Sequence, residues 1–451
     1  MDQNIVSNPI FFILGSTGTG KSSFAVELAK FLKDTNLYEN VVIINCDVMQ
    51  FYQDLPIATN KISSDEMKNI PHAFLGFLDC HDFYLFDPVE AFFNSESTHS
   101  LIPQSSTNSR FDIRCYVDKV TEFINRYFAV YSNSAIIICG GTCYYAQSIL
   151  FNNTLVSEDD DKVSTSHSND DGAEGELWDV LNRIDPQIAS RYHPNDKRRL
   201  RRLIAIHRKT KKLPSEIYSS KNVELRFPKE RTFVLCLWLP RDQLYESLNA
   251  RVDAMISKGL LSEVMEFQKR NEGNNRQTSI METIGLKEFR DLFIHGDVLN
   301  EEFQGLVQSG IDQVKSNTRR YARQQERWLL NRFQTLLVYL KDDFISHHFM
   351  KIDSSQIKHS EDIVALVHAL FAGKAEKLFF SDCLHNITIE PKRPVSQEVC
   401  NICNTVVYGR GQMELHILSK HHRSAVKRRN IEIKFKEMFG KDLPPPKRRK
   451  I

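Results

Sequence analysis

Apolar residues along the chain form short continuous runs that alternate with amphipathic segments. The first run is IFFIL at 10–14, and others lie at 41–45 (VVIIN), 135–139 (AIIIC) and 232–238 (TFVLCLW). Continuous runs of this length are typical of strands that are covered on both faces, as in a parallel sheet. The pattern therefore predicts an α/β protein with a parallel sheet core.

A glycine-rich turn separates the first run from an amphipathic segment. Its sequence, GSTGTGKS, fits G-x-x-x-x-G-K-[ST] at every fixed position and lies between a predicted strand and a predicted helix. Such a loop turns its backbone N–H groups inward below a helix N-terminus, its lysine adds a charge, and the Ser22 hydroxyl is a ligand for Mg²⁺. We expect a P-loop that binds a diphosphate or a triphosphate, of a nucleotide or of another compound. The predicted phosphate-binding residues are Gly15, Ser16, Thr17, Gly18, Thr19, Gly20, Lys21 and Ser22.

Asp47 and Thr142 follow two of the predicted strands and should face the same crevice as this loop, because ligands of parallel sheets lie at the carboxyl ends of strands. Nucleotide hydrolases usually place an aspartate after a second buried strand, but the run at 135–139 leads into Gly140 and Gly141. Asp47 suits a kinase or another group transferase that needs a base. Taken alone, Asp47 could equally be a turn residue or a helix cap.

Helical patterns at 177–225, 241–270, 283–294 and 300–335 accompany the strands, and 154–176 is acidic and almost without apolar residues, which is typical of a disordered loop. Pro391 and Pro394 mark a linker. The predicted organisation is a catalytic core (1–150), a helical insertion (151–225), the rest of the core with a helical region (226–390), a small cysteine and histidine unit (391–430) and a basic tail (431–451).

Charge and cysteine usage narrow the class of protein. The 451 residues carry a net charge of only +2, but basic residues gather near 197–212, near 315–327 and after 420, which favours a polyanion as partner. No apolar run approaches the roughly 20 residues of a membrane span, so we expect no membrane partner. The nine cysteines are mostly scattered, which indicates free thiols in a reducing compartment.

The C-terminal part contains the pattern Cys400-x2-Cys403-x12-His416-x5-His422. Two cysteines and two histidines at these spacings predict a tetrahedral Zn²⁺ site, in which His421 competes with His422 for the fourth position. The basic residues after it favour contact with nucleic acid, and the final PPPKRRK resembles a nuclear import signal.

Taken together, the motifs resemble the tRNA dimethylallyltransferases, also called tRNA isopentenyltransferases, in their eukaryotic form with a matrin-type zinc finger. The resemblance implies transfer of the dimethylallyl group from dimethylallyl diphosphate to N6 of the adenosine 3′ to the anticodon (position 37) of tRNA. It further implies a P-loop core, Mg²⁺ in catalysis, a monomer, and a cytoplasmic protein with nuclear and mitochondrial pools. The motifs that carry it are GSTGTGKS (15–22), NCDVMQFY (45–52), IPHAFLGFLD (70–79), GGTCYYAQSIL (140–150), HPNDKRRLRR (193–202), RVDAMISKGL (251–260), ETIGLKE (282–288) and TRRYARQQERWL (318–329).

The resemblance also implies roles for individual residues. Asp47, Ser22 and Arg251 would be catalytic: Asp47 would take the proton of the adenine amine, and Ser22 and Arg251 would act on the diphosphate. Leu286 departs from the family pattern and receives no role. A small-molecule kinase and a nucleic-acid-binding regulator remain alternatives. Residues matched to tRNA contacts are Asp47, Val48, Met49, Gln50, Thr142, Arg198, Arg199, Leu200, Arg201, Arg202, Thr318, Arg319, Arg323 and Gln325.

Overall fold

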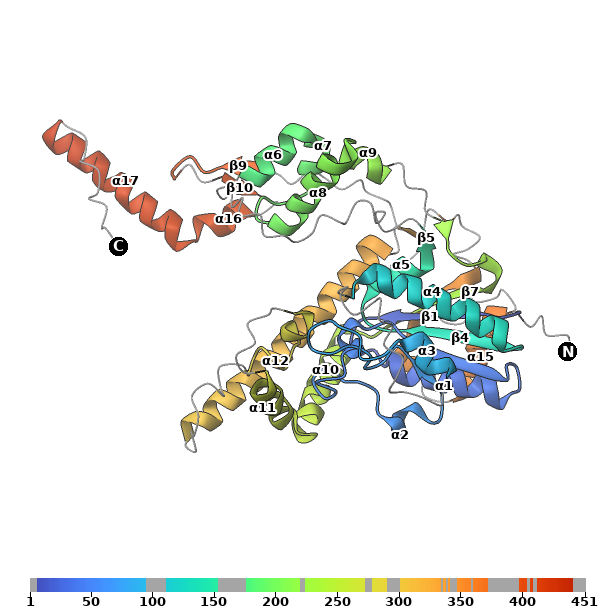
Figure 1. Ribbon diagram of the computed structural model, residues 1–451. Coiled ribbons are helices and arrows are strands. Elements are labelled where there is room, and N and C mark those ends of the chain that lie inside the picture. The colour runs from blue at the N-terminus through green and yellow to red at the C-terminus, as the bar shows by residue number, and fades with distance from the viewer. Residues whose placement is uncertain are drawn as a thin grey trace. The chain divides into compact units, whose positions relative to one another are not determined.

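The computed structural model divides into two compact units, which are considered separately (Figure 1). Unit 1 contains residues 1–155 and 222–387, and unit 2 contains residues 156–221 and 388–451. The expected acidic loop (except residue 176), the proline linker and the basic tail from 441 onward fall outside the described residues. Described are residues 6–94, 111–152, 176–219, 224–271, 278–289, 301–333, 336–337, 340, 347–357, 360–371, 397–403, 406–408 and 412–440.

Unit 1 is built on a six-stranded sheet in the order β3-β2-β4-β1-β7-β8, and every neighbouring pair of its strands is parallel. This confirms the predicted α/β fold. Sequence patterning missed both edge strands, because β3 has only two residues and β8 (FMKID) contains polar positions. The strands are β1 (Ile10–Gly15), β2 (Asn40–Asn45), β3 (His72–Ala73), β4 (Ser134–Cys139), β7 (Thr232–Trp238) and β8 (Phe349–Asp353).

Helices cover both faces of this sheet. Alternate residues of β1 enter different cores: Phe11 and Ile13 lie in one, and Phe12 and Leu14 lie in the other. The first core includes α1 (Lys21–Asp34) and α15 (Ser360–Phe371), whereas the second includes α4 (Ile113–Val130) and α5 (Cys143–Leu150). Two-sided burial explains why the strands read as continuous apolar runs. Smaller elements are a 3-10 helix (Val48–Phe51), α2 (Ser64–Met67), α3 (Pro88–Phe93), and the paired strands β5 (Phe151–Asn152) and β6 (Glu224–Leu225).

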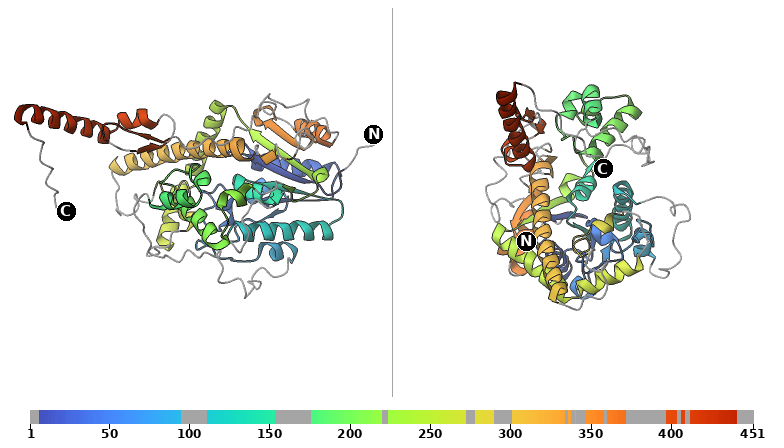
Figure 2. Two further views of the ribbon diagram at one scale, coloured as in Figure 1. Left: turned by 90° about the horizontal axis from the view of Figure 1, so that it is seen from above. Right: turned by 90° about the vertical axis from the view of Figure 1, so that its left-hand side faces the viewer.

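Three further helices complete the described part of unit 1. The predicted helical stretch 241–270 is two helices, α10 (Arg241–Ser257) and α11 (Leu260–Arg270), because Gly259 adopts φ +97° between them. The long helix α12 (Glu301–Trp328) has one end at the sheet and extends beyond it (Figure 2), and it leads into a π-helical turn, Leu329–Phe333. The predicted helix at 283–294 is wrong over its described part: 283–289 form turns after a 3-10 helix, Ser279–Glu282. Gly285 at φ +101° packs there against Leu260.

Unit 2 contains short helices and a cysteine-bearing hairpin. The core of the helical part is formed by Leu181, Ile188, Leu200, Leu203 and Ile204. None of the described helices in either unit is long and apolar enough to cross a membrane. The described elements of unit 2 are α6 (Glu176–Ile184), α7 (Pro186–Ala189), α8 (Lys197–Thr210), α9 (Pro214–Ser219), β9 (Gln397–Val399) antiparallel to β10 (Val406–Tyr408), α16 (Gln412–Ile417) and α17 (Lys420–Phe439).

Candidate active site

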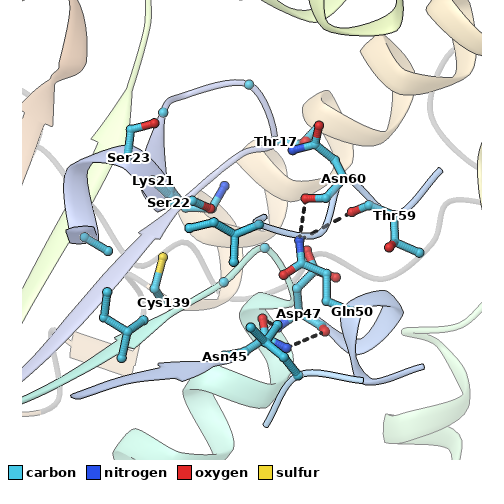
Figure 3. A pocket seen from close by; sticks show the side chains of 18 of the residues that line it. Thr17, Lys21, Ser22, Ser23, Asn45, Asp47, Gln50, Thr59, Asn60 and Cys139 are labelled. Atoms are coloured by element: carbon cyan, nitrogen blue, oxygen red, sulfur yellow. Dashed lines mark hydrogen bonds between the residues drawn. The ribbon is translucent and has the colours of Figure 1, made fainter. Parts of the chain in front are cut away.

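A pocket of about 250 Å³ lies at the carboxyl ends of β1, β2 and β4. The glycine-rich loop (residues 15–22) and Asp47 line opposite sides of it, as Figure 3 shows. The sequence predicted this juxtaposition from the carboxyl-end rule alone. Thr142 lies next to this site, where its hydroxyl accepts a hydrogen bond from the Val48 N–H at 3.1 Å.

The glycine-rich loop is held in shape by its own side chains. Gly18 and Gly20 have φ values of +86° and +76°, a backbone conformation that favours glycine. Lys21 is only 8% exposed, and its ammonium group donates to the Ser16 carbonyl at 2.7 Å. Burial lowers the pKa of Lys21, although the nearby Asp47 carboxylate opposes this shift. The exposed Ser22 lies in the first turn of α1 and also lines the pocket.

Helix α10 supports the loop from outside. Arg251 donates to the Thr17 hydroxyl, and the Ser247 hydroxyl donates to the Gly18 carbonyl at 2.9 Å. Burial lowers the pKa of Arg251 while Asp47 raises it. Lys21 and Arg251 therefore place two cationic groups beside the glycine-rich loop, an arrangement that suits a multiply charged anion.

Asp47 is a helix cap and also a residue of the pocket. It caps the 3-10 helix Val48–Phe51, accepting from the Met49 N–H at 3.2 Å, and it also lines the pocket. Asn45 fixes the backbone of Asp47, because the Asn45 side-chain oxygen accepts a hydrogen bond from the Asp47 N–H at 3.1 Å. Burial raises the pKa of Asp47, and Lys21 and Arg251 act in the opposite direction. A carboxylate with a raised pKa is better matched to taking a proton near neutrality.

The two glycines after β4 are required by close packing against the Asp47 turn. A Cβ on Gly140 would lie 2.1 Å from the Cys46 carbonyl carbon, and one on Gly141 would lie 3.0 Å from Asp47 Oδ2. Any side chain at Gly140 would therefore push the β2 and β4 ends apart. This explains why the strand leads into Gly140 and Gly141 where a hydrolase would carry its aspartate.

Gln50, on the opposite wall of the pocket, was among the predicted site residues, but the contacts that hold this wall were not predicted. Gln50 donates to the carbonyls of Thr59 and Asn60 at 3.3 and 3.1 Å, and all three residues line the pocket. Glu263 of α11 accepts from the backbone N–H groups of Ile57 and Ala58 at 2.7 and 2.8 Å. A side chain bonded to backbone some 200 residues away in sequence leaves no periodic or spacing signal, which is why the sequence did not indicate Glu263.

The residues matched to tRNA contacts are not all on the surface. Arg198, Arg199, Arg201 and Arg202 are exposed on α8, whereas Leu200 is fully buried in the core of that helical part. Contact of Leu200 with tRNA would have to run through its backbone or its neighbours.

On α12 the same set divides between surface and interior. Arg319 donates to Asn249 Oδ1 at 2.5 Å and Arg323 to the Tyr245 hydroxyl at 3.2 Å. Thr318 and Gln325 are buried; the Thr318 hydroxyl donates to the Val314 carbonyl at 2.7 Å, and Gln325 bonds to the walls of the pocket. Val48 and Met49 belong to the 3-10 helix that Asp47 caps.

Unit 2 brings together the four residues of the cysteine and histidine pattern. Ligand atoms of Cys400, Cys403, His416 and His422 all lie within 4.8 Å of one another and can hold a metal ion. His422 is buried and places Nδ1 3.4 Å from Cys400 Sγ and 3.2 Å from His416 Nε2. His421 is exposed and stands outside this cluster, with its ring centroid 6.4 Å from that of His416.

Known proteins match most of this chain. Residues 89–332 match the family model described as IPP transferase. The tRNA dimethylallyltransferase of Bacillus subtilis (strain 168) is 31% identical, over 73% of this chain and 90% of its own length. The tRNA dimethylallyltransferase of Homo sapiens is 29% identical, over 93% of this chain and 86% of its own length. The fold is similar to that of a solved eukaryotic dimethylallyltransferase, with a TM-score of 0.66 over 96% of this chain and 100% of that one at 24% identity. The chain therefore belongs to the IPP transferase family, as its motifs implied.

Proposed function

We propose that this protein is a tRNA dimethylallyltransferase, which transfers the dimethylallyl group of dimethylallyl diphosphate to N6 of adenosine 37 in tRNA and releases diphosphate. The observation that carries the proposal is the single pocket in which an anion cradle with Lys21 and Arg251 faces the carboxylate of Asp47. The curated relatives, which are tRNA dimethylallyltransferases and align with most of this chain, support the proposal.

The cradle side of the pocket suits the leaving group. When the allylic C–O bond breaks, its electron pair stays with the diphosphate, so negative charge grows on the phosphate oxygens. The loop N–H groups, Lys21 and Arg251 would bind the phosphate oxygens and stabilise this charge, which would lower the barrier. The same residues would bind the diphosphate before reaction.

The Asp47 side suits the acceptor. The adenine N6 forms a bond to the allylic carbon and must then lose a proton, which the Asp47 carboxylate accepts. The Thr142 hydroxyl accepts from the Val48 N–H, and Gln50 donates to the Thr59 carbonyl, both near the end of β2. There Thr142 and Gln50 would orient the base. An adenosine in an anticodon loop can leave its stack to reach such a pocket at a cost of a few kcal/mol.

The donor groups present fit the two metals that the family resemblance implies. Ser22 offers an exposed hydroxyl oxygen at the pocket, which suits Mg²⁺. Bound Mg²⁺ would neutralise part of the diphosphate charge. Cys400, Cys403, His416 and His422 supply two thiolates and two imidazoles, the donor set of a structural Zn²⁺ site, and the basic α17 that follows would contact tRNA.

We extend the proposal to binding and location. The exposed arginines of α8, with Arg319 and Arg323 of α12, supply positive charge for the tRNA backbone. The family resemblance also implies that the protein acts as a monomer. The C-terminal PPPKRRK supports a nuclear pool besides the cytoplasm and mitochondria.

A product assay tests the function. Purified protein is incubated with unmodified tRNA, dimethylallyl diphosphate and Mg²⁺, and the nucleosides are then analysed by mass spectrometry. We expect N6-isopentenyladenosine with the wild type and none with Asp47→Ala. A protein that ignores the allylic diphosphate and instead transfers phosphate from ATP would be a kinase. Binding of tRNA without any covalent product would indicate a regulator.

A further inference from the structure

Gln325 of α12 has a side-chain amide that joins two walls of the pocket. Its Oε1 accepts from the Thr17 N–H at 2.8 Å, and its Nε2 donates to the Gly141 carbonyl at 2.8 Å. The side chain is only 6% exposed. Both ends of a buried amide are therefore used, one on the glycine-rich loop and the other on the turn after β4.

The Gly141 end of this bridge lies directly beside Asp47. A Cβ placed on Gly141 would be 2.9 Å from Gln325 Nε2 and 3.0 Å from Asp47 Oδ2, so the amide and the carboxylate flank the same residue. The Gly141 N–H also bonds to the Asp47 carboxylate, which lowers its pKa. Moving Gly141 would therefore move a partner of Asp47.

At its other end, the Gln325 amide holds the glycine-rich loop through Thr17. The N–H of Thr17 is bonded to Gln325 and its hydroxyl to Arg251, so both polar groups of Thr17 are held by helices outside the loop. A loop fixed in this way needs little rearrangement when an anion enters, and preorganised donors stabilise developing charge more effectively.

We propose that Gln325 is a positioning residue that sets the spacing between the glycine-rich loop and Asp47, and hence between the diphosphate and the base that accepts the proton. The inference rests on the proposed prenyl transfer. It differs from the role implied by resemblance, a direct contact with tRNA, because the amide is buried and occupied. It predicts effects on anion binding and turnover rather than on tRNA affinity.

Two substitutions separate the possibilities. Gln325→Met keeps the length and volume of the side chain but removes both hydrogen bonds. Gln325→Glu retains an acceptor for the Thr17 N–H but adds a negative charge near Asp47, which raises the pKa of Asp47. Gln313→Met is the matched control, because Gln313 is an exposed glutamine on the same helix that does not line the pocket. The ionisable groups that face Asp47 are Lys21, Arg251, Cys46, Tyr116, Cys139, Cys143 and Tyr321.

The experiment measures binding of inorganic pyrophosphate with Mg²⁺ by calorimetry, then kcat, KM for tRNA and the pH dependence of kcat. For Gln325→Met we expect pyrophosphate affinity and kcat to fall, kcat on the order of 10- to 100-fold as for a small misplacement of reacting groups, with KM for tRNA unchanged. Gln325→Glu should move the acid limb of the kcat profile to higher pH. Gln313→Met should match the wild type in every measurement.

Opposite results would overturn the inference. A change in KM for tRNA alone would show a tRNA contact. Loss of thermal stability in Gln325→Met together with an unmoved pH profile in Gln325→Glu would show a purely structural role. If the wild type makes no prenylated adenosine, the proposed function fails, but pyrophosphate binding by Gln325→Met still decides whether the amide shapes the cradle.

Discussion

Arg251 of α10 donates a hydrogen bond to the Thr17 hydroxyl, so a helix that begins more than 200 residues later in the chain holds the glycine-rich loop. The following helix, α11, carries Glu263, which holds the opposite wall of the pocket through two backbone N–H groups. The α10 and α11 pair thus braces both sides of the site. Arg251 and Glu263 hold different walls of the pocket, so mutations should separate their effects.

Replacement of Arg251 by Ala should impair the step in which the diphosphate leaves. The guanidinium fixes Thr17 and, under the proposed function, would stabilise the negative charge on the diphosphate. We therefore expect kcat to fall by about 10²- to 10³-fold, as for loss of one charge-stabilising donor. Arg251→Lys keeps the charge without the fork of donors and should recover only part of the loss. Single-turnover kinetics on tRNA provide the measurement. A wild-type rate in Arg251→Ala would remove the guanidinium from the mechanism.

Glu263→Gln tests the opposite wall. An amide can accept only one of the two N–H bonds and turns its own NH₂ toward the other, which leaves a buried donor unpaired and should cost about 1–3 kcal/mol of stability. Because the wall carries Thr59 and Asn60, whose carbonyls hold Gln50 on the acceptor side, KM for tRNA should also rise. Glu266 is an exposed glutamate on the same helix, and Glu266→Gln is the control. Equal thermal stability and equal KM in the two variants would contradict this role for Glu263.

The sequence predicted the four central strands of the sheet, and it predicted the glycine-rich loop and Asp47 in the pocket, because their signals are local. Continuous apolar runs mark strands buried on both faces, and the carboxyl-end rule brings Asp47 to the loop at 15–22 without any knowledge of helix packing. The contacts of Glu263 and Gln325 depend on which segments meet in three dimensions. The turn at 283–289 was missed for a similar reason, since Gly285 takes a positive φ where it packs against Leu260.

Ionisation of Asp47 should lower the stability of the folded protein and raise its activity as the pH increases. Burial raises its folded pKa, so the folded state holds the proton more tightly than the unfolded state, and the ionised carboxylate destabilises the fold at pH values above the unfolded value. Asp47→Asn keeps a capping oxygen for the Met49 N–H but has no charge to bury. It should therefore melt at a higher temperature than the wild type at pH 7, with the difference shrinking as the pH falls through the folded pKa and absent below the ordinary pKa of an aspartate.

Activity should respond in the other direction. Wild-type turnover should fall as the pH drops through the folded pKa of Asp47, because a protonated carboxyl cannot accept the N6 proton. Asp47→Asn should show a residual rate without that acid limb. Calorimetric melting at several pH values and a pH profile of single-turnover rates make the two measurements. A less stable Asp47→Asn protein at neutral pH would show that the charge is stabilised by Lys21 and Arg251 more than burial opposes it.

The cysteine and histidine cluster of unit 2 offers a comparison between two adjacent histidines. His422 is buried within the cluster, whereas His421 is exposed. His422→Ala should lose bound Zn²⁺, and His421→Ala should keep it, as measured by metal analysis of the purified proteins and by the absorbance of a cobalt-substituted form. Zinc retained in His422→Ala but lost in His421→Ala would show that His421, and not His422, is the fourth zinc ligand.

Loss of this metal should weaken tRNA binding more than diphosphate binding. The Ser419 hydroxyl caps α17 at the His422 N–H, and Arg429 of the same helix donates to the Asn401 carbonyl between the two cysteines, so the cluster orients a helix rich in lysine and arginine. A double change of Cys400 and Cys403 to Ser releases that helix while leaving every residue of the pocket intact. We expect the Kd for tRNA to rise, with a smaller dependence on salt because fewer phosphates are contacted, and the Kd for pyrophosphate to stay at its wild-type value. If tRNA affinity and its salt dependence are both unchanged, the basic helix serves a partner other than tRNA.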